Sequence, residues 1–214
     1  MSSPYYEHGG ITIYNCDCRE ILPSLKADAV VTDPPYGIGC SGRVNNPGAA
    51  PWDAERADVA GMLFGSRPLC VWGGNYFADQ LPASESWLIW LKRPAGFDGD
   101  TRTYAPLEMA WTNYGGKPRV KTHVWDGGKR AGEKENRTFC HPAQKPIEVM
   151  RWCIVFAPNE PGTILDPFMG SGTTLRAAKD LGRKAIGIEI EERYCEIAAK
   201  RLAQEVLDFE GAQR

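Results

Sequence analysis

Residues 30–39 read VVTDPPYGIG and place chemically active side chains beside residues that hold them rigidly. Asp33 follows an apolar run typical of a strand, so its carboxylate is expected at the carboxyl end of the strand, where open α/β sheets bind ligands. Pro34 and Pro35 fix the backbone and lack N–H groups, which leaves their carbonyls as rigid acceptors. With the flat ring of Tyr36, these acceptors suit a planar amine such as that of a nucleobase. A turn capped by Asp33 is the structural alternative.

Residues 166–174 read DPFMGSGTT and indicate a second binding element. A strand is expected to end at Asp166, and Gly170 and Gly172 let the backbone approach a ligand before a helix begins, where free N–H groups bind anions. Glu189 ends the next predicted strand, ~20 residues further on, and could accept hydrogen bonds from a ribose. Leu175 replaces the third glycine of the dinucleotide fingerprint. The pattern therefore favours a ligand with an adenosine-like ribose, and dinucleotides remain candidates.

These two elements belong to a chain in which strand patterns alternate with helix patterns. Such alternation predicts one α/β domain with a doubly wound, Rossmann-like sheet flanked by helices. We expect strands near residues 10–17, 28–35, 68–74, 86–93, 107–114, 162–168 and 184–190, and helices near 18–25, 169–183 and 191–209.

The composition excludes several classes of protein. The chain has 214 residues and a net charge of −2, which fits one globular domain and gives no overall sign of nucleic-acid binding. No apolar run approaches the ~20 residues of a membrane span, and the first residues lack the features of a secretory signal. Seven cysteines without a CxxC pair favour reduced thiols over a metal site. We expect a cytoplasmic protein without bound metal.

Two segments, residues 37–58 and 112–146, are rich in glycine and polar residues and are expected to be long loops. Loops of this length in a compact domain commonly serve binding. Basic residues interleaved with aromatic ones in the second segment suit contacts with phosphates, although a solvated surface loop is the alternative. The candidate DNA-binding residues are Arg43, Lys117, Arg119, Lys121, Trp125, Lys129 and Arg130.

Together, DPPYG and DPFMGSGTT resemble the two principal motifs of the DNA amino-methyltransferases that use S-adenosylmethionine. HPAQKP, residues 141–146, is similar to a third motif of that family, and NCDCREILPSL, residues 15–25, to the stretch near the cofactor adenine. The catalytic motif precedes the cofactor motif, which resembles the circularly permuted order of the beta class. The resemblance runs from Ile11 to about Leu202.

The resemblance implies a division of roles among the residues. Asp33, Pro34, Pro35 and Tyr36 would form the catalytic arm, with the Tyr36 ring stacked on a base flipped out of double-stranded DNA. Residues 112–140 would form a small DNA-recognition insertion within a single domain covering residues 1–214, and a homodimer is one state that the resemblance allows. The implied cofactor-binding residues are Asp17, Cys18, Asp33, Lys145, Asp166, Phe168, Gly170, Ser171, Gly172, Thr173 and Glu189.

The first residue of the catalytic motif bears on the target base. In the family, members that methylate adenine N6 usually begin this motif with Asp or Asn, and those that methylate cytosine N4 more often begin it with Ser. Asp33 therefore favours adenine. Methylation of cytosine N4, of RNA or of a protein side-chain amide, and a silent module that binds DNA or cofactor remain alternatives. A nicotinamide-dependent oxidoreductase would leave DPPY unexplained.

Overall fold

The computed structural model describes residues 3–39, 53–62, 67–93, 105–126, 129–130, 144–158, 160 and 162–203. Within these residues the main feature is a nine-stranded sheet in the order β1-β2-β11-β10-β3-β4-β6-β5-β7. Its strands are β1 (Tyr6–His8), β2 (Ile11–Asn15), β3 (Ala29–Thr32), β4 (Leu69–Trp72), β5 (Trp87–Leu91), β6 (Leu107–Thr112), β7 (Arg119–Thr122), β10 (Thr163–Asp166) and β11 (Lys184–Glu189). The Rossmann-like α/β fold expected from the sequence is confirmed.

The centre of the sheet is parallel. β2, β11, β10, β3 and β4 run in one direction, so their carboxyl ends meet at one edge. The chain continues from β10 to β11 on one side, whereas β3 pairs with β10 on the other. A reversal of strand order of this kind opens a crevice outside the carboxyl ends, which is where such sheets bind ligands.

The remaining strands depart from the simple alternation that the sequence suggested. β6 lies antiparallel between β4 and β5, and β7 then adds parallel to β5 at the edge. No α-helix joins β4 to β5 in the part of the chain that is described; a 3₁₀ helix, η4 (Gly74–Phe77), follows β4 instead. A small hairpin of β8 (Trp125–Asp126) and β9 (Lys129–Arg130) follows β7. Residues 112–146 are thus only partly a loop.

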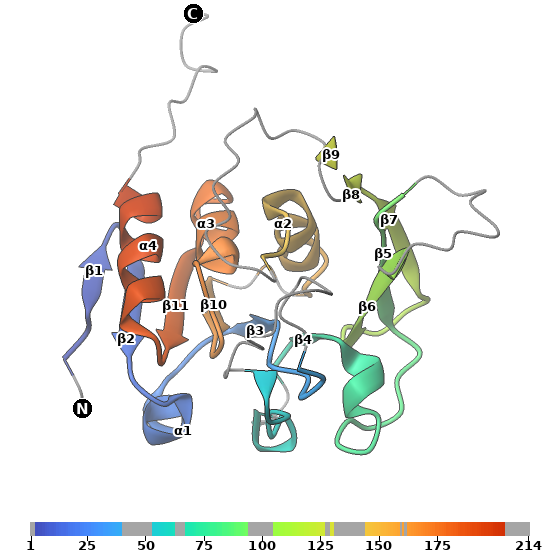
Figure 1. Cartoon of the computed structure of the whole chain (residues 1–214), viewed down its shortest axis with the longest axis horizontal. Helices are drawn as coiled ribbons and strands as arrows, with labels where there is room; N and C mark the ends of the chain where they lie inside the picture. Colours follow the sequence, from blue (N-terminus) through green and yellow to red (C-terminus); the bar gives the residue numbers. More distant parts are fainter. Residues whose placement is uncertain are drawn as a thin grey trace, which may run out of the picture.

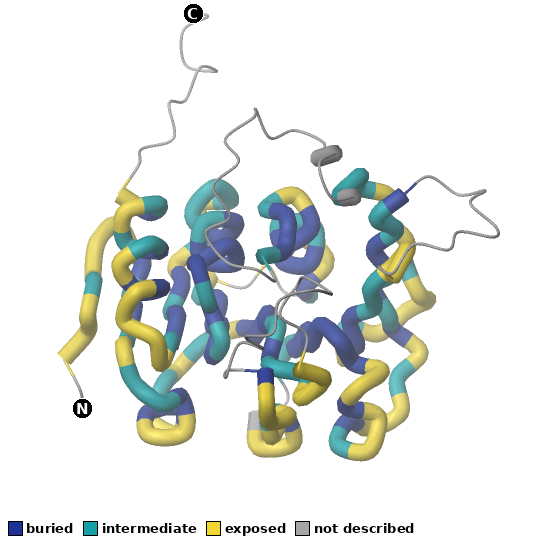
Figure 2. Tube along the Cα trace, in the orientation of Figure 1, coloured by how far each residue is buried: buried dark blue, intermediate teal, exposed yellow. Residues whose placement is uncertain are grey.

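Helices cover both faces of the sheet (Figure 1). One face carries α2 (Ile147–Val155), α3 (Thr173–Asp180) and α4 (Glu192–Ala203), while α1 (Cys18–Ile21) and η4 lie on the other. Short 3₁₀ helices also occur as η1 (Leu22–Ser24) and η3 (Ala60–Met62). Alternate residues of β4 enter the two cores: Cys70 and Trp72 face α2, whereas Leu69 and Val71 face α1 and η4. The buried residues are concentrated in the sheet and on the sides of the helices that face it (Figure 2).

The helix α2 was not foreseen and separates the HPAQKP motif from β10. It begins directly after Pro146, which has an extended backbone and serves as its N-cap. Val149, Met150, Cys153 and Ile154 are buried against the sheet and α3, at spacings that place them on one side of a helix. Lys145 is consequently delivered to the carboxyl edge of the sheet by the start of α2. None of the described helices is long and apolar enough to cross a membrane.

Candidate active site

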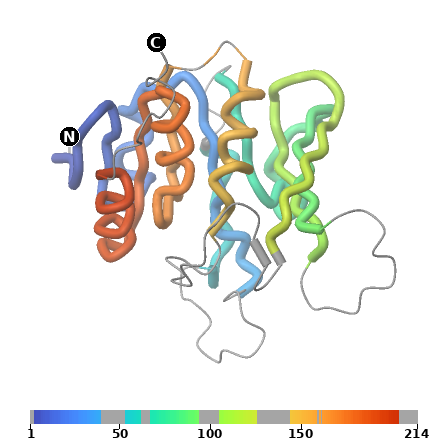
Figure 3. The backbone as a smooth tube through the Cα atoms, turned by 90° about the horizontal axis from the view of Figure 1, so that it is seen from above, coloured from blue at the N-terminus to red at the C-terminus, as the bar shows by residue number. Residues whose placement is uncertain are grey.

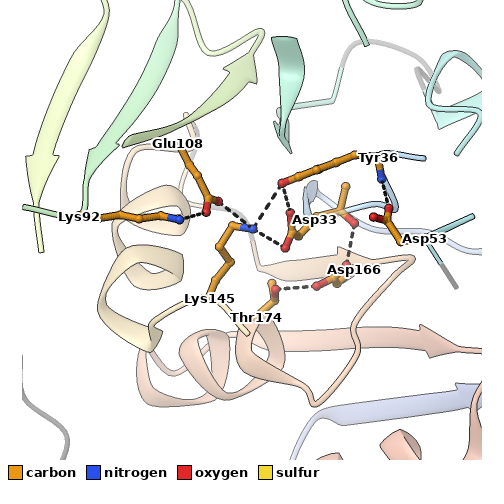
Figure 4. A network of polar contacts seen from close by, with 9 residues as sticks. Asp33, Tyr36, Asp53, Lys92, Glu108, Lys145, Asp166 and Thr174 are labelled. Carbon is orange, nitrogen blue, oxygen red and sulfur yellow. Dashed lines mark hydrogen bonds and ion pairs between the residues drawn. The ribbon is translucent and has the colours of Figure 1, made fainter. Parts of the chain in front are cut away.

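The catalytic arm and the glycine turn, residues 166–174, lie at the same edge of the sheet. β3 and β10 are adjacent and parallel, and the Thr32 hydroxyl donates a hydrogen bond of 2.7 Å to Oδ1 of Asp166. Asp33 directly follows Thr32, so two motifs that are far apart in sequence lie at the ends of adjacent strands (Figure 4). Both elements therefore lie at the edge where sheets of this kind bind ligands.

Asp33 accepts hydrogen bonds on both carboxylate oxygens. The Tyr36 hydroxyl donates to Oδ1 at 2.6 Å, and the Lys145 ammonium donates to Oδ2 at 2.5 Å. Burial raises the pKa of Asp33 above its ordinary value, although the charge of Lys145 acts in the opposite direction. An ionised carboxylate has about four lone-pair positions, so these two donors leave acceptor capacity for an incoming amine.

Lys145 connects Asp33 to a second acid, Glu108 on β6. Its Nζ lies 3.1 Å from Oε2 of Glu108, and Lys92 pairs with Oε1 of the same carboxylate. Burial alone would raise the pKa of Glu108, but Lys145 and Lys92 outweigh it and lower that pKa to about 2. Glu108 therefore remains charged at neutral pH. An acid within a buried strand needs a partner of opposite charge, and Lys92 is one such partner here.

Residues 53–57, here called the clamp segment, hold the catalytic arm from outside. Oδ1 of Asp53 accepts hydrogen bonds from the backbone N–H of Tyr36 at 2.9 Å and of Gly37 at 3.0 Å. The backbone N–H of Ala57 donates to the carbonyl of Pro35 at 3.1 Å. Among the described residues, no donor bonds to the carbonyl of Pro34. Of the two prolyl carbonyls, that of Pro34 is the one left for a ligand.

The Tyr36 ring is packed between neighbours from the loop after β4. The Tyr76 ring stacks on it with centroids 4.9 Å apart and an interplanar angle of 18°, and Phe77 meets it edge-on at 6.1 Å. Gly73 has a positive φ of 67°, and a Cβ there would lie 2.2 Å from Cε1 of Tyr36. Only glycine at position 73 leaves room for this ring. The local sequence of this loop gives no sign of its contact with the catalytic arm.

The glycine turn leads directly into α3. Gly172 is the N-cap of α3 with φ of 76°, and a Cβ there would lie 2.8 Å from that of Ala198 on α4. The backbone N–H of Gly170 donates to Oε2 of Glu189 at 3.0 Å, and that of Glu191 donates to Oε1 at 2.8 Å. Burial raises the pKa of Glu189. Its carboxylate thus lies at the turn and still has lone pairs for a further donor.

Asp166, which the resemblance places among the cofactor-binding residues, makes several hydrogen bonds within the protein. Its carboxylate is buried and accepts hydrogen bonds from the hydroxyls of Thr32 and Thr174 and from the backbone N–H of Phe168. Burial raises its pKa to about 6. These contacts join β3, β10 and α3, so the geometry favours a role in positioning the turn.

The other expected cofactor residues are spread along the same edge. Asp17 caps α1 through the N–H of Arg19 and pairs with the Arg19 guanidinium. Asn15 bonds to the carbonyl of Glu189, which joins the ends of β2 and β11. Cys18 is buried in α1, the Ser171 hydroxyl lies 3.5 Å from Oε1 of Gln144, and the Thr173 hydroxyl accepts a hydrogen bond from Arg201.

The expected DNA-binding residues fall into two groups. Arg119 stacks its guanidinium on Phe156 at 4.7 Å, near the end of α2, and lies at the amino end of the sheet with Lys117. Figure 3 shows the turn between β6 and β7 at the end of the sheet opposite residues 33–39. This separation argues against Arg119 and Lys117 as contacts near a base held at Asp33.

The second group lies at the carboxyl end of the sheet. Lys121 pairs with Trp90 near the end of β5, and the N–H of Trp125 bonds to the carbonyl of Lys92. Lys129 and Arg130 form β9, opposite Trp125 and Asp126. These residues therefore come from segments beside the Lys92–Glu108 ion pair. Arg43 lies outside the described residues.

Some residues of the site were not singled out from the sequence. Asp53 lies in a polar loop with no local pattern that distinguishes it, and Tyr76 lies after β4 in a segment without a distinctive pattern. Glu108 gave a signal, because an acid within an apolar strand needs a partner. Thr32 gave none, since a β-branched residue is common at the end of a buried strand.

Comparison with known proteins shows similarity to DNA methyltransferases. Residues 97–200 match the model of a family described as DNA methylase, N6_N4_Mtase. The Type II methyltransferase M.ScaI of Streptomyces caespitosus is 28% identical over 96% of this chain and 85% of its own length. M2.LlaDCHI of Lactococcus lactis subsp. cremoris, also a Type II methyltransferase, is 29% identical over 94% of this chain and 93% of its own.

Solved structures agree on the fold. The M1.HpyAVI–SAM complex is 25% identical with a TM-score of 0.56, covering 91% of this chain and 100% of its own. The cytosine-N4-specific PvuII DNA methyltransferase is 16% identical with a TM-score of 0.63, covering 97% and 92%. The second likeness shows the fold alone. Together, the family match and the curated relatives support a DNA methyltransferase that acts on an amine of adenine or cytosine.

Proposed function

We propose that this protein transfers the methyl group of S-adenosylmethionine to N6 of an adenine flipped out of double-stranded DNA. The presence of Asp at the start of DPPY supports adenine over cytosine, and the order of the motifs supports the beta class. The observation that carries the proposal is the Thr32–Asp166 hydrogen bond, because it holds the acceptor arm one strand from the glycine turn.

The residues present fit a cationic cofactor with a ribose. Glu189 and the N-terminus of α3 flank the turn at Gly170, and Gly172 is confined to a conformation that glycine adopts without strain. Glu189 would accept the ribose hydroxyls, and the acids at the carboxyl edge complement a positive charge. When bound, S-adenosylmethionine supplies an electrophilic methyl group on a sulfonium.

The catalytic arm would activate the target amine. Asp33 and the carbonyl of Pro34 accept its two N–H bonds, which favours a pyramidal nitrogen with a free lone pair. The nitrogen–carbon bond would form as the carbon–sulfur bond breaks, the electron pair of the broken bond would stay on the sulfur of the departing thioether, and the nitrogen would release one proton to solvent. Positioning and directed hydrogen bonds account for such catalysis. Because a stacked base cannot reach the arm, it must leave the duplex.

The test compares Asp33→Ala with the wild type and with Asp58→Ala, a control at an exposed acid. DNA is incubated with labelled cofactor and digested to nucleosides. We expect N6-methyladenine from the wild type and the control, and a rate lower by about 10²–10³-fold or more from Asp33→Ala with cofactor binding retained.

Each other result has a distinct meaning. N4-methylcytosine would reject the adenine assignment, and methyl groups found only in RNA or protein would reject DNA. Cofactor binding without any transfer by the wild type would favour a silent binding module. Equal loss of binding and transfer in Asp33→Ala would assign Asp33 a structural role.

A further inference from the structure

Lys145 is a buried cation at the candidate active site. Its side chain is 8% exposed, and the ammonium lies against two carboxylates, those of Asp33 and Glu108. It also lies 5.6 Å from the centre of the Trp72 ring and 3.4 Å from the Tyr36 hydroxyl. A lysine is rarely buried unless it is paired. Here the pairing is with the acid proposed to bind the target amine.

These contacts do not match a lysine that binds the cofactor. Both ionic partners of Lys145 are acids, one from the catalytic arm and one from β6, and neither belongs to the glycine turn. The ammonium has three N–H donors, and it has three polar neighbours: Asp33, Glu108 and the Tyr36 hydroxyl. The sequence resemblance had placed Lys145 among the cofactor-binding residues.

We propose that Lys145, anchored by Glu108, is a positioning residue that keeps the Asp33 carboxylate ionised and aimed at the target amine. The inference deepens, and rests on, the function proposed above. It assigns to Glu108 and Lys145 a part in the reaction although neither touches the base.

The charge balance at this edge explains why such a group is needed. Asp33 and Glu108 contact the same ammonium, and Asp166 is hydrogen-bonded to Thr32, the residue before Asp33. Burial and the negative charge of Glu108 raise the pKa of Asp33. A protonated Asp33 would present an O–H to the amine in place of an acceptor. An opposite charge within about 4–6 Å typically lowers the pKa of a carboxyl group by about 1–3 units. Lys145 is the cation in direct contact with Asp33.

Glu108 gives Lys145 a fixed position. Burial alone would lower the pKa of Lys145, but Asp33 and Glu108 outweigh it and raise that pKa above its ordinary value, so the ammonium keeps its charge. Lys92 in turn pairs with Glu108. The four charges alternate in sign from β5 to β6, to the start of α2 and to the end of β3 (Figure 4). This row of two cations and two carboxylates has no net charge.

The decisive experiment follows the titration of Asp33 itself. The carboxyl carbon of Asp33 is observed by ¹³C NMR in the wild type, in Lys145→Met, and in Lys200→Met, a matched control on the exposed face of α4. We expect the pKa of Asp33 to rise by about 1–3 units in Lys145→Met and to stay unchanged in the control. An unchanged titration in Lys145→Met would overturn the proposal.

Two further measurements separate positioning from cofactor binding. In Lys145→Met, the acidic limb of the methyl-transfer rate should move to higher pH, because Asp33 must be ionised to accept the amine, while affinity for S-adenosylmethionine stays the same. Lys145→Arg, which keeps the charge, should restore the wild-type limb. Loss of cofactor affinity with an unmoved limb would make Lys145 a cofactor ligand and contradict the inference.

Glu108→Gln provides a second route if Lys145→Met does not fold. We expect the limb to move to higher pH, because the loss of the anchor for Lys145 outweighs the loss of the repulsion by which Glu108 itself raises the pKa of Asp33. In the Lys145→Met background only that repulsion is lost, so the same change should move the limb to lower pH. Equal effects in both backgrounds would show that Glu108 acts independently. If the wild type methylates no DNA, the proposed function fails, yet the NMR titration still decides whether Lys145 controls Asp33.

Discussion

Two contacts of Tyr36 suggest two separate contributions to its proposed role. Its hydroxyl donates to Asp33, and its ring lies on Tyr76. A flipped base that stacks on Tyr36 must use the ring face that Tyr76 does not cover, or replace Tyr76. The hydroxyl contact helps to orient Asp33, whereas the ring supplies stacking, so the two contributions can be separated by substitution.

Replacing Tyr36 with Phe and with Ala tests this separation. Tyr36→Phe keeps the ring and should change DNA affinity little, while Tyr36→Ala should weaken binding of the flipped base by about 1–3 kcal/mol. Fluorescence of 2-aminopurine at the target position measures flipping, and single-turnover rates measure transfer. If Phe and Ala reduce flipping equally, the hydroxyl rather than the ring holds the base.

At the scale of single residues, the sequence identified groups whose position follows from a strand end. Asp33 directly follows one apolar strand and Glu189 ends another, so their position at the carboxyl edge of the sheet could be predicted. Lys145 could not be assigned in the same way, because its partner Glu108 lies on an antiparallel strand. The pairing depends on sheet order, which local sequence does not encode.

Among the elements, the clamp segment is what makes the catalytic arm rigid beyond its prolines. Arg56 forms a β-bridge with Tyr36 and joins the segment to Asp79 through two hydrogen bonds. Its guanidinium also donates to the carbonyl of Tyr76. The clamp segment therefore connects the arm after β3 to the loop after β4, and the Tyr36–Tyr76 stack lies between them.

Asp53→Ala should loosen this connection. The change leaves the N–H groups of Tyr36 and Gly37 without their buried acceptor, which typically costs about 1–3 kcal/mol of stability. We expect a lower midpoint of unfolding in denaturant and a slower methyl transfer with unchanged cofactor affinity. Glu55→Ala, an exposed neighbour, serves as the control. A variant with wild-type transfer rate would show that the prolines alone position the arm.

Elements with a strong apolar period were predictable, and those formed by tertiary pairing were not. β10, α3 and β11 follow the expected strand, turn, helix and strand order. β7 reads RVKT, and its one aliphatic residue, Val120, is 59% exposed, so nothing in its pattern indicates a strand. It exists because β5 offers an unpaired edge.

For the molecule as a whole, the two ends of the sheet have different content. The carboxyl end gathers the catalytic arm, the glycine turn and the segments around β8 and β9. The amino end holds the turn between β6 and β7, where the side chain of Asn113 accepts a hydrogen bond from the N–H of Leu69. A basic stretch that looks continuous in sequence is thus divided between opposite ends.

This division predicts unequal effects of two lysines on DNA binding. Lys129, on β9, belongs to the carboxyl end, whereas exposed Lys117 lies at the amino end. A lysine that contacts phosphate releases counterions, so Lys129→Ala should weaken binding to duplexes of any sequence and reduce the salt dependence of the logarithm of affinity by about 1. Lys117→Ala should leave both unchanged. Fluorescence anisotropy of a labelled duplex over a series of salt concentrations measures both, and equal slopes for the two variants would place the DNA elsewhere on the surface.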